Sequence, residues 1–141
     1  MNFDGIEIST QLQGLLSAAV EAGRLPHTII LEGGSENDRL ALARLLARVH
    51  VCSGENVPCG VCPDCVKAGK GFHPDIFEAV ATEGNKDALK VDAVREIRSN
   101  AFVFPNEAAR RVFILHNMNF ANEQAQNALL KILEEPPEYV R

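Results

Sequence analysis

Four cysteines within a short segment carry the strongest chemical signal in this sequence of 141 residues. Cys52, Cys59, Cys62 and Cys65 follow the spacing C-x6-C-x2-C-x2-C, and the glycines and prolines among them supply turns. Four thiolates that fold back onto one centre give the closed tetrahedral coordination of structural zinc, which leaves no open position for a catalytic water. We therefore predict a structural zinc site on these four cysteines.

Other uses of the cysteines remain open at this point. Inert buried thiols are one, and a disulfide is another, although a reducing compartment disfavours it. An iron–sulfur cluster is the chemical rival, because Cys59, Cys62 and Cys65 resemble part of a ferredoxin run, but the expected C-x3-C-P ending is missing. His50 and His73 flank the segment and could replace a ligand, yet with four cysteines present we expect both to be structural.

A glycine turn provides a second chemical signal. A P-loop reads G-x-x-x-x-G-K-[ST]: its amides hold phosphate, its lysine reaches the terminal phosphate, and its hydroxyl ligates magnesium. Here Gly33 and Gly34 open the loop, but Asp38, Arg39 and Leu40 stand where the second glycine, the lysine and the hydroxyl residue belong. The Asp38 carboxylate would repel a phosphate, and Leu40 cannot ligate magnesium. We therefore expect no ATP at this loop.

The same turn also fits a simple helix start, with Ser35 as the cap and Asp38 three residues later. The third expected strand gives an independent check, because P-loop ATPases carry an acidic pair at its end. This sequence has Leu115-His116-Asn117 there, and His116 has no acidic partner beside it in the sequence. Both signals predict a fold built for ATP hydrolysis that has lost the chemistry.

The elements that must position these residues alternate between helix and strand. The cysteine segment, 52–65, has neither period, and the alternation around it predicts a parallel sheet covered on both faces. Apolar residues at helical spacing predict helices over 9–22, 37–49, 91–101 and 121–134. Short apolar, β-branched runs predict buried strands over 27–32, 75–80 and 111–116. The expected inward face of the second helix comprises Leu40, Ala43, Leu46 and Ala47.

Composition limits the classes of function. The 14 basic and 19 acidic residues give a net charge of −5, which disfavours a protein that wraps nucleic-acid phosphates. Aromatic residues make up 6% of the chain, too few for a base-stacking platform. No secretory signal opens the sequence, and runs such as 28–31 are far shorter than the ~20 residues that span a bilayer. We expect a cytoplasmic protein of one domain with no membrane segment.

Five segments resemble, in order, the N-terminal part of the delta-prime type of clamp-loader subunit in bacterial DNA polymerase III, a branch of the AAA+ family. The last motif, N-A-L-L-K-I-L-E-E-P-P, is highly specific to clamp loaders. Gamma/tau subunits share these features but have an intact lysine and acidic residues, so the altered loop points to the delta-prime type. The matching segments are Ala22–His27, Cys52–Cys65, His73–Asp75, Val91–Ile97 and Asn127–Pro137.

The resemblance implies an α/β, P-loop NTPase-like (AAA+) parallel sheet flanked by helices. Residues 1–141 would form the N-terminal part of that domain, with a zinc-binding insertion at about 50–72. The sensor strand, the lid, the collar domain and the arginine that reaches a neighbour's ATP would lie beyond Arg141, so Arg110 and Arg111 are not assigned that role. The implied function is a non-catalytic stator that contacts gamma/tau and delta subunits and meets primer–template DNA through the assembled complex.

Two other functions remain open. One is a divergent gamma/tau-type subunit in which Arg39 still contacts phosphate. The other is a stand-alone zinc-binding nucleic-acid module that uses basic residues on its surface, namely Lys67, Lys70, Lys86, Lys90, Arg95 and Arg98.

The resemblance also makes a prediction about the sheet. In the family, the sensor strand lies between the first and third strands, so this chain must pair those two directly or leave edges unpaired. We expect self-association or a rearranged sheet.

Overall fold

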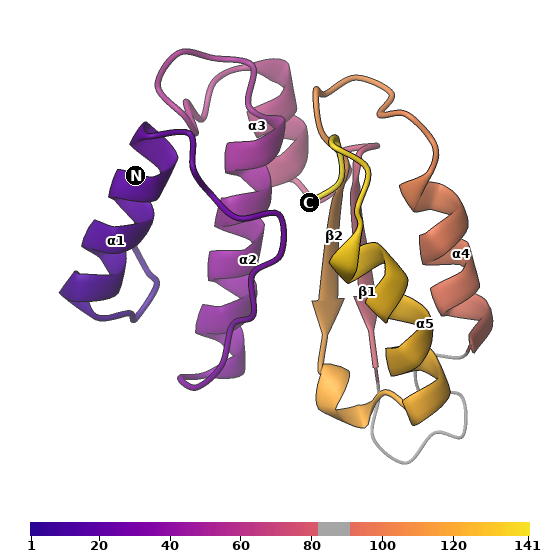
Figure 1. The fold of residues 1–141 in the computed structure, drawn as a ribbon. Helices are drawn as coiled ribbons and strands as arrows, with labels where there is room; N and C mark the ends of the chain where they lie inside the picture. Colours follow the sequence, from indigo (N-terminus) through magenta and orange to yellow (C-terminus); the bar gives the residue numbers. More distant parts are fainter. Residues whose placement is uncertain (82–90) are drawn as a thin grey trace. The chain divides into compact units, whose positions relative to one another are not determined.

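A computed structural model of the chain describes residues 1–81 and 91–141 (Figure 1). The chain divides into two compact units, Met1–His73 and Pro74–Arg141, which are described separately below. No helix in the described ranges is long and apolar enough to cross a membrane.

The first unit consists of three helices, α1 (Thr10–Glu21), α2 (Glu36–Val51) and α3 (Pro63–Gly69). The predicted helix 9–22 is confirmed: Ser9 caps α1 by accepting the N–H of Leu12 at 3.2 Å. Gly23 ends it in the left-handed region, with φ +63°, a conformation that glycine adopts without a steric penalty. The predicted helix 37–49 is confirmed as α2, which is slightly longer at both ends.

The core of the first unit lies between α2 and the N-terminal segment. Leu42, Leu45 and Leu46 of α2 are buried in one cluster with Phe3. The expected inward face was therefore partly wrong, since Leu40 and Ala43 are only half-buried. The helical period alone does not show which apolar stripe meets Phe3, a residue more than thirty positions away in the sequence.

The predicted strand over 27–32 is wrong for the structure as described. This segment belongs to no strand, and the Ile30 side chain is 86% exposed. A strand is stable only with a hydrogen-bonded neighbour, and the sheet within the described ranges contains two strands, neither of which pairs with it. The expected direct pairing of the first and third strands is therefore not found.

The cysteine segment was expected to lack a helix or a strand, but helix α3 begins within it. Cys62 caps this helix and Pro63 is its first residue, the position that suits a proline. A helix of seven residues is too short for its apolar period to be recognised in the sequence. Helices α2 and α3 lie side by side.

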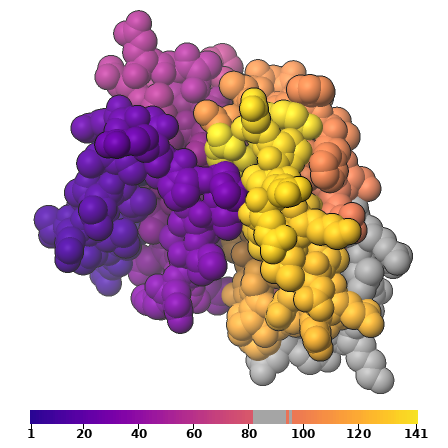
Figure 2. Space-filling view, in the orientation of Figure 1, coloured from indigo at the N-terminus to yellow at the C-terminus, as the bar shows by residue number. Residues whose placement is uncertain are grey.

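The second unit carries a parallel pair of strands, β1 (Ile76–Val80) and β2 (Val112–His116), with Ile76 opposite Val112. This confirms the second and third predicted strands and their parallel direction. Helices α4 (Val91–Ala101) and α5 (Glu123–Glu134) confirm the predicted helices 91–101 and 121–134 and pack side by side, and a 3₁₀ turn (Met118–Phe120) precedes α5. Asn122 caps α5. Yellow α5 and the C-terminal residues form much of this unit's visible surface (Figure 2).

The core of the second unit joins the helices to the sheet. Half-buried Phe113 and Leu115 of β2 pack against it. Its buried members are Ala81, Val94, Ile97, Ala101, Ala121, Ala125, Leu129, Ile132 and Val140.

A buried ion pair fixes the loop before β2. Asp75 is fully buried and accepts the backbone N–H groups of residues 106–108 at 2.6–3.0 Å. The Arg111 guanidinium lies 3.4 Å from this carboxylate and 5.2 Å from the centre of the Phe77 ring. Burial acts to raise the pKa of Asp75, but the three N–H groups and Arg111 outweigh it and hold the pKa below its usual range. Arg111 is thus part of the core.

Candidate metal centre

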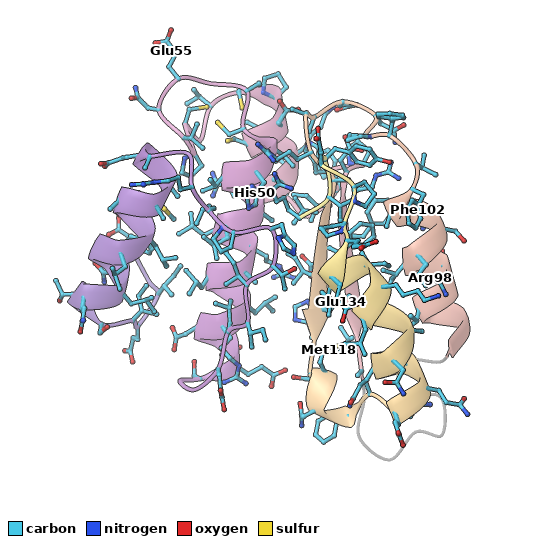
Figure 3. All side chains as sticks on the ribbon, in the orientation of Figure 1. His50, Glu55, Arg98, Phe102, Met118 and Glu134 are labelled. Carbon is cyan, nitrogen blue, oxygen red and sulfur yellow. The ribbon has the colours of Figure 1, made fainter. Side chains whose placement is uncertain are left out.

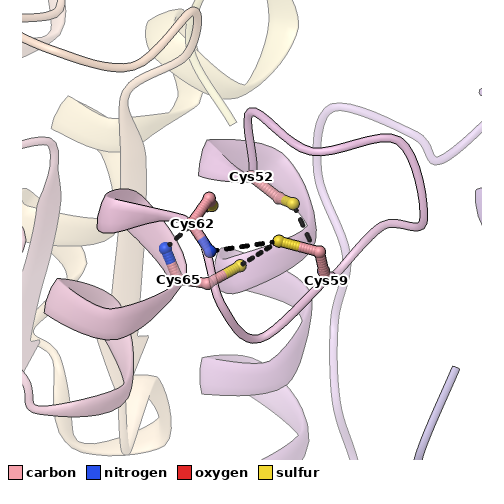
Figure 4. Close-up of side chains that lie close together, drawn as sticks. All are labelled: Cys52, Cys59, Cys62 and Cys65. Atoms are coloured by element: carbon pink, nitrogen blue, oxygen red, sulfur yellow. Dashed lines mark hydrogen bonds between the residues drawn. The ribbon is translucent and has the colours of Figure 1, made fainter.

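The four cysteines meet at the end of the first unit. Cys52 ends α2, Cys62 caps α3 and Cys65 lies in its first turn, with Cys59 in the connecting loop. All four Sγ atoms lie within 4.8 Å of one another (Figure 4). The Sγ atoms of Cys59 and Cys65 are 4.0 Å apart, close to the ~3.8 Å between sulfurs in a zinc tetrathiolate with bonds of about 2.3 Å.

Backbone N–H groups point at the sulfurs. The Cys52 Sγ accepts the N–H groups of Gly54 and Cys59 at 3.4 and 3.3 Å. The Cys62 N–H donates to the Cys59 Sγ at 3.3 Å, and the Cys65 N–H donates to the Cys62 Sγ at 3.4 Å. Such donors stabilise a thiolate relative to a thiol, and the thiolate is the form that binds metal.

These contacts shift the pKa values of the thiols in different directions. The N–H groups of Val61 and Cys62 lower the pKa of Cys59. Burial opposes ionisation of Cys62, but hydrogen bonds from Cys65 and Ser53 prevail and lower its pKa to about 6. Burial raises the pKa of Cys65 to about 12, so a bound metal would have to displace that proton.

Gly54 shows how tightly the loop folds back on itself. A Cβ atom at this position would lie 2.8 Å from the Cys59 Sγ and 3.7 Å from the Cys52 Sγ. Real Cβ atoms do not approach so closely, so only glycine fits between these two cysteines. Four converging sulfurs, backbone donors and this close packing suit a soft, tetrahedral metal such as zinc.

The flanking histidines are not part of the sulfur cluster. Among the described residues, all four cysteines are free of disulfides, and the cluster contains sulfur donors alone. His73 is buried instead against Asp64, with 3.4 Å between His73 Nε2 and Asp64 Oδ1. The other Asp64 oxygen accepts the Ser53 hydroxyl at 2.7 Å. This arrangement could not be predicted from the sequence, because Ser53 and Asp64 lie eleven residues apart and match no motif.

Arg39 binds two carbonyl oxygens of the glycine loop. Gly33 and Gly34 have positive φ angles of 76° and 61°. The Arg39 Nη1 donates to their two carbonyl oxygens at 2.8 and 2.9 Å. Ser35 caps α2, as predicted, by accepting the N–H of Asp38 at 3.1 Å.

Asp38 occupies the start of helix α2. Its carboxylate accepts the Ser35 hydroxyl and, at 2.8 Å, the backbone N–H of Glu7. Both bonds lower the pKa of Asp38, so it is ionised at neutral pH. A negative charge thus stands at the helix end that a P-loop offers to phosphate, and Leu40 is half-buried behind it.

The end of β2 holds a partner that the sequence did not reveal. His116 Nε2 lies 3.4 Å from Glu78 Oε2 of the adjacent strand, without hydrogen-bond geometry.

The basic residues considered for nucleic-acid binding are only partly described. Lys70 is exposed in the first unit, and Arg98 is half-buried in the second. Lys67 is half-buried in the first unit, whereas Lys86, Lys90 and the side chain of Arg95 lie outside the described part of the chain. The described residues therefore do not test the predicted basic surface.

Comparison with known proteins places the chain in a family. Residues 8–141 match the family described as DNA polymerase III, delta subunit. DNA polymerase III subunit gamma/tau of Mycobacterium bovis is 37% identical over 127 residues, which cover 89% of this chain and 22% of that protein. The tau subunit of Escherichia coli is 30% identical over 128 residues, with 89% and 19% covered.

The gamma subunit of Buchnera aphidicola is 29% identical over 128 residues, with 89% of this chain and 34% of that protein covered. The chain therefore spans between about a fifth and a third of the length of these relatives. Their names favour the gamma/tau type and do not single out the delta-prime type predicted from the sequence. Because the family match covers almost the whole chain, this protein belongs to the DNA polymerase III delta subunit family of clamp-loader proteins.

Proposed function

We propose that the chain is the N-terminal part of a clamp-loader subunit that supports ATP-dependent loading of the sliding clamp in DNA replication without hydrolysing ATP itself. Family membership supports the clamp-loader role. The glycine loop supports the non-catalytic role. As part of such a complex, the protein would associate with gamma/tau and delta subunits and would meet primer–template DNA through the assembly.

The observation that carries the non-catalytic role is the position of Arg39. In a P-loop, the basic side chain at this position reaches a phosphate. Here the Arg39 guanidinium is directed back to the carbonyls of Gly33 and Gly34. The Asp38 carboxylate lies at the helix start, where the phosphates of a nucleotide would bind. Phosphate binding would require Arg39 to leave both carbonyls and Asp38 to lose its charge.

A gamma/tau-type subunit that binds ATP is the second candidate. The names of the relatives favour it, since they are gamma, tau or gamma/tau subunits. On this account Arg39 would turn outward and contact phosphate when nucleotide is present. The two candidates differ in one measurable property, which is the affinity for magnesium–ATP.

A calorimetric titration of the purified chain with ATP and magnesium separates them. We expect no magnesium-dependent binding, while the tau subunit of Escherichia coli, titrated in parallel, serves as the comparison. Binding that disappears in the Arg39→Ala variant and persists in the Arg44→Ala variant, at an exposed position of the same helix, would establish the second candidate.

We further propose that Cys52, Cys59, Cys62 and Cys65 hold one structural zinc ion. Convergence of the four Sγ atoms within 4.8 Å supports this assignment. Zinc supplies no catalysis in a closed four-thiolate site; it fixes the loop between α2 and α3. Metal analysis of protein purified without added metal is expected to return about one zinc per chain, and iron in its place would support the iron–sulfur alternative.

A further inference from the structure

A hydrogen-bonded polar group lies beside the sulfur cluster: Asp64 and His73 are buried, and the exposed Ser53 contacts Asp64. Asp64 is 9% exposed and His73 is 4% exposed. The Ser53 hydroxyl donates to Asp64 Oδ2 at 2.7 Å, and His73 Nε2 lies 3.4 Å from Asp64 Oδ1. Both carboxylate oxygens are therefore engaged by side chains from outside helix α3.

Ser53 and Asp64 lie next to the proposed metal ligands in the sequence, so the hydrogen bond between them can affect the ligands. Ser53 follows Cys52, the ligand that ends α2, while Asp64 lies between Cys62 and Cys65 in the first turn of α3. The Ser53–Asp64 bond therefore joins the two stretches of chain that supply the sulfurs. Without a bound metal, the Ser53–Asp64 hydrogen bond holds the two stretches together. With a metal bound, the same hydrogen bond sets the direction from which each sulfur approaches the ion.

We propose that Asp64 is a positioning residue for the metal centre, acting through Ser53 on the Cys52 side and through the turn that carries Cys62 and Cys65. This inference rests on the proposed zinc site. Groups that hold metal ligands from outside the coordination sphere typically contribute 10–100-fold to metal affinity.

A simpler role for Asp64 is to stabilise α3 as an acidic residue in a first helical turn. That role needs only exposure near the helix N-terminus. It does not require burial, and it does not require the Ser53 and His73 contacts. The two roles also predict different results: a helix-stabilising residue affects folding, whereas a positioning residue changes metal affinity and ligand geometry.

The test compares zinc affinity, by competition with a chromophoric chelator, and the visible spectrum of the cobalt(II) form in the intact chain. Asp64→Ala is expected to bind zinc about 10–100-fold more weakly than the wild type and to show altered cobalt bands. Asp64→Asn keeps an acceptor for Ser53 and is expected to lose less affinity. Ser53→Ala is also expected to weaken zinc binding, because the Ser53 hydroxyl bonds both Asp64 and the Cys62 thiol.

Glu55→Gln is the matched control. Glu55 belongs to the same loop but is exposed and points away from the sulfurs (Figure 3), so this variant should retain wild-type affinity. Should Asp64→Ala not fold, Asp64→Asn and Ser53→Ala carry the comparison.

Failure of the Asp64 positioning role and failure of the proposed zinc site would give different results. Wild-type zinc affinity and cobalt spectra in both Asp64→Asn and Ser53→Ala, or in a folded Asp64→Ala, would overturn the positioning role while leaving the zinc site intact. A wild-type chain that binds neither zinc nor cobalt would overturn the site itself and the inference with it.

Discussion

Single residues account for most of the chemistry of this chain. The spacing of Cys52, Cys59, Cys62 and Cys65 predicted a common centre, and the structure brings their sulfurs together. The loop residues Asp38 and Arg39 were predicted not to bind phosphate, and this stays a prediction. In the structure, Asp38 accepts a backbone N–H and Arg39 donates to a loop carbonyl. The Asp64 contacts could not be predicted, because they depend on how the loop folds back.

Gly54→Ala tests the tight packing of the cysteine loop. The added methyl group would overlap the Cys59 Sγ, at 2.8 Å, and overpacking of this kind costs about 1–3 kcal/mol. We expect a lower melting temperature and weaker zinc binding. Gly14→Ala is the control, because its Cβ would meet nothing within 4 Å in helix α1. Equal melting temperatures for wild type and Gly54→Ala would refute the packing argument.

Asp75→Asn tests the buried ion pair of the second unit. The substitution leaves the buried Arg111 charge unpaired and turns an amide NH₂ or a neutral oxygen toward three N–H donors. Breaking a buried pair costs about 3–5 kcal/mol in unfolding free energy, measurable by urea denaturation. Glu138→Gln, at an exposed position, should change it little. A loss below about 1 kcal/mol, as for an exposed pair, would contradict the role assigned to Asp75.

The same pair sets a direction for the pH dependence. Because the folded chain holds the pKa of Asp75 below that of the unfolded chain, the ionised carboxylate contributes stability above the unfolded pKa of about 3.9. That contribution is lost as the pH falls through the folded pKa. Urea denaturation from pH 6 to pH 3 should show a steeper loss of stability for the wild type than for Asp75→Asn. Parallel curves would contradict this prediction.

The helices of eleven residues or more and the two paired strands were predictable from the sequence, whereas the short helix α3 and the true state of segment 27–32 were not. Helix α4 has the predicted bounds, and α1, α2 and α5 differ from prediction by a few residues. Strands β1 and β2 were found because each is paired with the other. The segment 27–32 has the composition of a strand but no partner in the described sheet, and α3 is too short to have a recognisable period.

The segment 28–31 lies outside the described sheet and predicts self-association of the isolated chain. Thr28-Ile29-Ile30-Leu31 combines β-branched and apolar residues, and Ile30 is largely exposed, which is the pattern of a segment that pairs with another chain. Light scattering should show dimers or larger species that increase with concentration. Ile30→Lys, a charge at this exposed position, should shift the chain toward monomer. A wild-type chain that stays monomeric at all concentrations would be evidence against this view.

The whole molecule combines a family match with a glycine loop whose sequence departs from the P-loop motif. The family match covers residues 8–141, while the chain spans at most about a third of the length of the relatives described. The net charge of −5 was expected to disfavour direct nucleic-acid binding, and this expectation stays a prediction.

Clamp loading by a reconstituted assembly tests this account most directly. The assembly is prepared with the natural subunit that carries this sequence, with its Arg39→Ala variant, or without the subunit. We predict that loading of the clamp onto primed DNA is lost on omission and unchanged by Arg39→Ala, because the Arg39 guanidinium is bonded to the loop carbonyls of Gly33 and Gly34. Loading that persists without the subunit, or that is abolished by Arg39→Ala in a folded protein, would contradict the proposed role.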